Sequence, residues 1–160
     1  MISFKEYLTE QANKAGTYAG VRPSEKDADQ LSNMLGKFKV PNPEPKDKLH
    51  VTLLYSRKHL PNYVPNPNLS YKAEIKNLEI WPTKSGKNCL VMTMVSPALS
   101  SRHNALMKEH DATFDYPEFK VHLSLSYDVG DFDHAELSKH LPKSITLSKE
   151  YWEELNTVGK

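Results

Sequence analysis

Two short segments of the sequence place a histidine and a hydroxyl residue two positions apart among apolar residues. They read Leu49-His50-Val51-Thr52-Leu53 and Val121-His122-Leu123-Ser124-Leu125. Side chains alternate between the two faces of a β-strand, so we expect His50 and Thr52 to point one way and their apolar neighbours the other. The same reasoning holds for His122 and Ser124. Each strand is therefore predicted to present an imidazole and a hydroxyl on an open face.

Two imidazoles that face one cleft suit the chemistry of phosphodiesters. A neutral histidine can take a proton from an attacking hydroxyl, and a protonated one can give a proton to the leaving oxygen, because imidazole has a pKa near ~6.5. The hydroxyls of Thr52 and Ser124 can donate hydrogen bonds to the non-bridging phosphate oxygens. Neither step needs a metal. A lone histidine on such a strand is more often structural, but the pattern occurs twice, which favours a catalytic pair.

Alternating and helical patterns predict the elements that position these residues. The expected strands are 16–21, 49–55, 71–81, 88–95, 121–127 and 144–147, of which 71–81 and 88–95 should pair as a hairpin. The expected helices are a short one ending near Asn13, 25–38 after a Ser24 cap, 97–110 and about 133–140. We expect the residues after 147 to form a polar tail.

The expected elements repeat one arrangement, in which a helix and a break precede a strand that carries the histidine motif. This weak duplication predicts an α+β fold with two similar lobes of antiparallel sheet, outer helices and a central cleft. Since no long linker separates the halves, we expect residues 1–160 to form a single domain.

Composition excludes several classes of protein. The 160 residues have a formal net charge of +1, which is unsuited to coating a long nucleic acid, although a small anionic ligand remains compatible with it. No apolar run is long enough to span a membrane, and charges interrupt the start of the chain where a signal peptide would be apolar, so we expect a cytoplasmic protein. Cys89 is the single cysteine, which excludes a disulfide framework. Nothing in the sequence indicates a metal, a cofactor or an obligatory protein partner.

At its two His-x-Thr/Ser motifs the chain resembles the two-histidine phosphoesterase superfamily. Within it, the chain is most similar to the phage anti-CBASS phosphodiesterases, which destroy the cyclic oligonucleotide signals of bacterial immunity. The resemblance implies metal-independent cleavage of 3′,5′ bonds in cyclic di- and trinucleotides such as cyclic GMP-AMP, with His50 and His122 as the acid and base in either order. If the protein is phage-encoded, it would act in the host cytosol.

Aromatic residues around the motifs are candidates for binding the bases of such a substrate. Nucleobases stack on aromatic faces, and Tyr18, Trp81 and Trp152 offer such faces. Trp81 could instead be core packing. Glu150 could accept a hydrogen bond from a base amino group or remain a solvated charge.

Two other functions fit the same residues. One is a phosphodiesterase that acts on 2′,3′-cyclic phosphates at RNA ends. The other is a module that binds and sequesters a nucleotide without cutting it, in which case the histidines would not affect the fate of the ligand.

Overall fold

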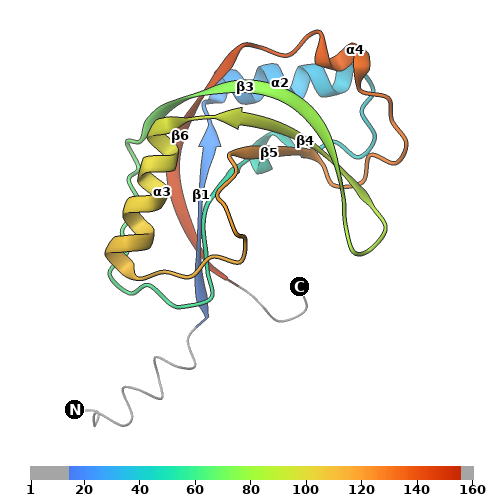
Figure 1. Ribbon diagram of the computed structural model, residues 1–160. Coiled ribbons are helices and arrows are strands. Elements are labelled where there is room, and N and C mark those ends of the chain that lie inside the picture. Colours follow the sequence, from blue (N-terminus) through green and yellow to red (C-terminus); the bar gives the residue numbers. More distant parts are fainter. Residues whose placement is uncertain (1–14, 156–160) are drawn as a thin grey trace, which may run out of the picture.

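The computed structural model describes residues 15–155, in which six antiparallel strands follow one another in a closed ring (Figure 1). The order around the ring is β1-β2-β5-β4-β3-β6. The strands are β1 (Gly16–Pro23), β2 (Val51–Ser56), β3 (Ser70–Pro82), β4 (Asn88–Val95), β5 (His122–Ser126) and β6 (Ser144–Leu155). The helices are α2 (Glu25–Lys37), the 3-10 turn η1 (Lys46–Lys48), α3 (Pro97–His110) and α4 (Ala135–Ser138). The helix expected before Asn13 lies outside the described residues.

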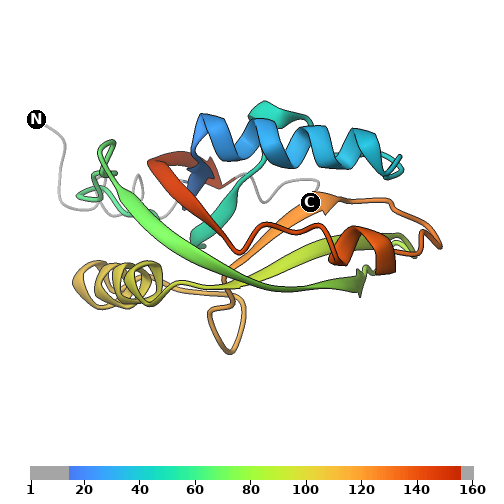
Figure 2. The same ribbon diagram turned by 90° about the horizontal axis from the view of Figure 1, so that it is seen from above.

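The two long helices begin and end where their sequences predict. The Ser24 side chain accepts a hydrogen bond from the backbone N–H of Asp27, which caps the start of α2. Ser96 caps α3 in the same way, Pro97 occupies its first turn, and Asp111 ends it in the left-handed conformation. Figure 2 shows α2 and α3 well apart, each beside a different part of the sheet. No helix within residues 15–155 is long and apolar enough to cross a lipid bilayer.

The ring consists of two groups of strands, one with β1 and β2 and the other with β3, β4 and β5, and β6 runs along both. The first part of β6 pairs with β3 and the remainder with β1. On the other side of the ring, β2 and β5 are paired at Val51 and Leu123 alone. The helix-then-strand order is repeated, because α2 precedes β2 and α3 precedes β5. This arrangement confirms the predicted α+β fold, and the β3–β4 hairpin is also as expected.

The last strand is longer than the sequence predicts. The alternating apolar pattern ends at Leu147, yet β6 continues to Leu155 because its polar residues pair with β1 over nearly the whole length of that strand. The prediction of a polar tail after residue 147 was therefore wrong for residues 148–155. Backbone pairing holds this segment, which a search for alternating apolar residues does not detect.

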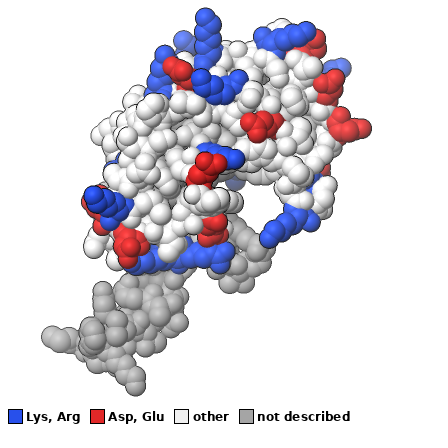
Figure 3. Space-filling model, viewed as in Figure 1, with Lys and Arg blue, Asp and Glu red and all other residues white. Residues whose placement is uncertain are grey.

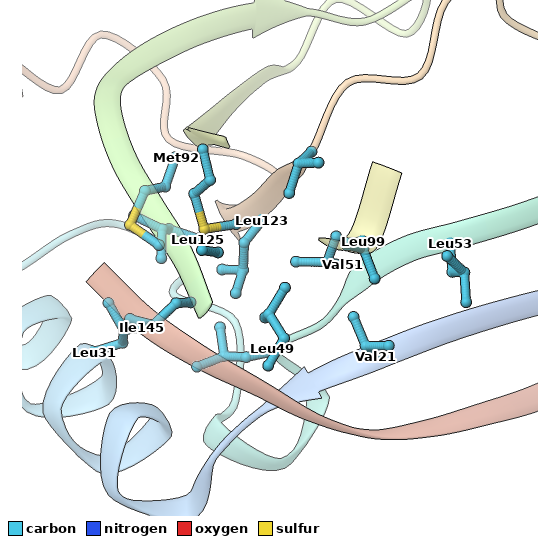
Figure 4. Close-up of a cluster of buried hydrophobic side chains, with 14 of the residues drawn as sticks. Val21, Leu31, Leu49, Val51, Leu53, Met92, Leu99, Leu123, Leu125 and Ile145 are labelled. Atoms are coloured by element: carbon cyan, nitrogen blue, oxygen red, sulfur yellow. The ribbon is translucent and has the colours of Figure 1, made fainter. Parts of the chain in front are cut away.

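The core connects the two motif strands. Figure 4 shows Val51 and Leu123 within one cluster of buried side chains that Leu31 of α2 and Leu99 of α3 also enter. Val51 and Leu123 are fully buried. Burial of these apolar side chains fixes which face of each motif strand turns outward.

Candidate active site

The alternation predicted for the two motifs is present in the structure. The apolar residues of both motifs are buried, whereas both histidines and both hydroxyl residues are partly exposed. His50 directly precedes β2, and His122 is the first residue of β5. Each motif is thus anchored by its buried residues, and its polar side chains face away from the core.

The pairing of β2 with β5 brings the two motifs side by side, although Ser124 is not among the residues that line the cleft. In an antiparallel pair, the neighbours of opposed residues also lie opposite each other. Since Val51 is opposite Leu123, the register places Thr52 across from His122 and His50 across from Ser124. His50, Thr52 and His122 line one cleft of about 640 Å³.

Both imidazoles are held in the same way. Nδ1 of His50 lies 2.9 Å from the carbonyl oxygen of Lys48, and Nδ1 of His122 lies 2.8 Å from that of Lys120. A carbonyl oxygen only accepts hydrogen bonds, so Nδ1 carries the proton in each ring. Nε2 of each ring remains available as the atom that takes or gives a proton in the cleft.

The surroundings of His122 favour its neutral form. Burial lowers the pKa of the His122 imidazole below its ordinary value, and the nearby positive charges of His50 and Lys120 lower it further. The hydrogen bond to the Lys120 carbonyl opposes this shift. A lowered pKa leaves more of the ring uncharged at neutral pH, which is the state that a general base requires.

A tyrosine lies beside each motif hydroxyl. The hydroxyls of Tyr18 and Thr52 share a hydrogen bond of 3.1 Å, and Ser124 lies against the hydroxyl of Tyr127. Burial raises the pKa of Tyr18 and of Tyr127, so both phenols stay protonated at neutral pH. Tyr18 and Tyr127 also line the cleft, and the two halves of the site therefore match in this respect too.

Trp81, one of the aromatic residues singled out from the sequence, also lines the cleft. Its ring lies against the His122 imidazole, with ring centroids 4.6 Å apart, and its Nε1–H donates to Glu79 at 3.0 Å. Trp81 is half-buried and belongs to the wall of the cleft, not to the hydrophobic core.

The prediction that Glu150 binds a base is wrong. Its carboxylate is fully buried and forms an ion pair with Arg102 at 2.9 Å. It also accepts hydrogen bonds from the Tyr63 hydroxyl and the backbone N–H of Asn66. Glu150 therefore holds β6 to α3 and to the segment before β3, and its oxygens are occupied by protein donors.

The structure also does not bring Trp152 into the cleft. Its ring is about half exposed, but the residue lies opposite Ala19, whose side chain points into the core, and it is not among the residues that line the cleft. The neighbouring Tyr151 lies on the other face, 6.2 Å from Tyr18 between ring centroids. The register of β6 against β1 shifts next to Lys149, which has a positive φ of 57°, so the faces of this strand could not be inferred from alternation.

One wall of the cleft was missed from the sequence. The segment between α3 and β5 contributes several aromatic residues to the lining, among them Phe114, Tyr116 and Phe119, and Tyr55 lines the cleft from β2. The available signal was the run of closely spaced aromatic residues directly before the second histidine motif.

The ring of strands and the cleft between its two histidines define the class of the fold, which is that of the two-histidine phosphoesterases. A solved structure of LigT from E. coli, complexed with 3′-AMP, is 13% identical and covers 92% of each chain with a TM-score of 0.56. A second structure, described as a phosphoesterase, is 12% identical and covers 92% of each chain with a TM-score of 0.57.

Sequence comparison identifies the family. The model of the family described as "Anti-CBASS protein Acb1" matches residues 15–159. The protein of that name from Enterobacteria phage T4 is 34% identical over 155 residues, which cover 97% of this chain and 94% of the relative. The one from Vibrio phage KVP40 is 36% identical over 121 residues, or 76% of this chain and 78% of the relative. The chain belongs to the Acb1 family.

Proposed function

We propose that the protein is a metal-independent phosphodiesterase that opens the 3′,5′ bonds of cyclic di- and trinucleotides and thereby counters CBASS defence in the host cytosol. The observation that carries the proposal is the matched presentation of His50 and His122, whose Nδ1 atoms are both bound to carbonyl oxygens and whose Nε2 atoms are left for the cleft. Membership of the Acb1 family supports the cyclic substrate.

The proposed reaction begins with a 2′-hydroxyl of the substrate. One imidazole takes its proton as the 2′-oxygen bonds to phosphorus, and the other protonates the 5′-oxygen as the P–O5′ bond breaks. The hydroxyls of Thr52 and Ser124 donate to the non-bridging oxygens, where negative charge accumulates. The ring opens to a linear product with a 2′,3′-cyclic phosphate, which water can open to a 3′-phosphate by the same exchange of protons.

The test is turnover of a panel of cyclic di- and trinucleotides and of an RNA with a 2′,3′-cyclic phosphate end, with products identified by mass. We expect rapid cleavage of a cyclic oligonucleotide, undiminished by excess EDTA, and a loss of at least ~100-fold in His50→Ala and in His122→Ala. His140→Ala, which removes an exposed imidazole outside the cleft, is the matched control and should keep full activity.

Other outcomes would redirect the proposal. Turnover of the RNA end alone would support the 2′,3′-cyclic phosphodiesterase. Tight binding of an intact cyclic nucleotide, unchanged by either alanine variant, would support sequestration without cleavage.

A further inference from the structure

The segment that joins α3 to β5 forms one wall of the cleft. Cleft-lining residues occur along it from Phe114 to Lys120, directly before His122. Tyr116 is 61% exposed although it lines the cleft. An aromatic side chain that lines a cleft and remains largely exposed is available to a ligand.

Contacts on both sides of Tyr116 hold this wall in place. Arg57, which directly follows β2, donates to both carboxylate oxygens of Asp115, at 2.9 and 3.0 Å. The Arg57 backbone N–H donates to the Thr113 hydroxyl at 2.8 Å, and the Thr113 N–H donates to Ser56 at 3.1 Å. The Phe114 ring meets Tyr116 edge-on, with 5.6 Å between centroids.

At the end of the wall near β5, Phe119 is held by a buried residue of α3. The buried imidazole of His103 on α3 stacks on Phe119 with centroids 4.0 Å apart and the rings 6° from parallel. The His103 Nδ1 lies 2.7 Å from the carbonyl oxygen of Leu53. Since the wall is already ordered, a ligand that packs on Tyr116 loses little free energy in ordering it.

The charges in the cleft leave aromatic contacts as the main source of affinity. Among the described residues that line it, Lys120 is the one lysine or arginine, and its ammonium lies 3.6 Å from the Glu118 carboxylate. Exposed cations of this kind contribute little to binding, whereas stacking on an aromatic ring contributes more per base.

We propose that Tyr116 is a stacking platform for one nucleobase of the substrate, separate from the aromatic face of Trp81. The inference rests on the proposed function and extends it: the substrate has two bases on either side of the phosphate that His50 and His122 contact, and each base has its own aromatic surface. A mononucleotide would use one of these surfaces.

Binding can be measured apart from cleavage in the His50→Ala background, with cyclic GMP-AMP as the probe. We expect Tyr116→Ala to weaken binding about 10–100-fold and Tyr116→Phe, which keeps the ring, to change it less than about threefold. The melting temperature of each variant checks that the protein stays folded.

Two modified probes identify the contact. In each, one base of cyclic GMP-AMP is replaced by hydrogen, and we expect Tyr116→Ala to have no effect on binding of one of the two. The platform role of Tyr116 would be refuted if Tyr116→Ala weakened binding of cyclic GMP-AMP and of both modified probes equally. It would also be refuted if Tyr116→Ala did not weaken binding of cyclic GMP-AMP, or if cyclic GMP-AMP did not bind at all. If the effect of Tyr116→Ala depends on one base but the wild-type protein hydrolyses no cyclic nucleotide, the stacking role of Tyr116 is supported and the proposed function is refuted.

Discussion

At the scale of single residues, the site depends on a proton held at one nitrogen of each histidine. The carbonyl oxygens of Lys48 and Lys120 each lie two residues before their histidine and fix the same tautomer in both rings. The two imidazoles differ in what surrounds them, because burial and the charges of His50 and Lys120 lower the pKa of His122. A histidine with a lowered pKa is mostly unprotonated at neutral pH, which is the form that a general base requires.

The pH dependence of catalysis tests this difference. With His122 as the base, activity is lost when its ring is protonated, so we expect the acidic limb of kcat/KM to have its midpoint below the ~6.5 of a free imidazole. Titration of the His122 ring by NMR should give the same midpoint, and His50→Ala should move it upward because a positive neighbour is removed. An acidic limb whose midpoint lies above pH ~6.5, or one that does not coincide with the His122 titration, would contradict a catalytic His122 with a lowered pKa.

At the scale of elements, β6 has a structural role that its local sequence pattern does not predict. Its second half is polar, pairs with β1, and carries the buried Glu150 that binds Arg102 of α3. The ion pair joins two elements far apart in the chain. Removing one partner of a buried pair leaves the other charge without compensation.

Glu150→Gln should therefore reduce stability and leave substrate binding unchanged. Arg102 is partly solvated, so we expect a loss of about 2–3 kcal/mol in the free energy of unfolding, at the low end for a broken buried pair. This corresponds to a fall of about 5–10 °C in Tm, measurable by calorimetry. Glu153→Gln, on the exposed part of the same strand, is the control and should change Tm by less than about 2 °C. A raised KM with an unchanged Tm would restore Glu150 as a base-binding residue.

At the scale of the whole molecule, the two halves share one core and one cleft, and each supplies one histidine. A continuous cluster of buried side chains runs through both halves, which supports the proposal that the chain works as one domain. Over the face shown in Figure 3, acidic and basic side chains are intermixed, with no broad patch of one sign. The balance of charges, +1 in total, suits a ligand with few phosphates.

Salt should accordingly have a small effect on the reaction. A cyclic dinucleotide has two phosphates, so we expect KM to rise by less than about tenfold between 50 and 200 mM salt, following the release of at most about two counterions. A 30-nucleotide RNA without cyclic ends, added in excess at 150 mM salt, should not inhibit turnover. Strong inhibition, or a much steeper salt dependence, would reveal a surface for long nucleic acids that the charge distribution does not indicate.

The sequence by itself determined the features that depend on local periodicity. Strand alternation is a property of neighbouring residues, so it placed His50, Thr52, His122 and Ser124 on the outward face of their strands, and helical spacing with the Ser24 cap located α2. Only the tertiary structure decided which residues from distant segments meet. A bulge at Lys149 and the pairing with β1 turned Glu150 inward and kept Trp152 from the cleft, and the α3–β5 segment became a cleft wall through contacts with Arg57 and His103. Such contacts join residues separated by tens of positions, and no local pattern encodes them.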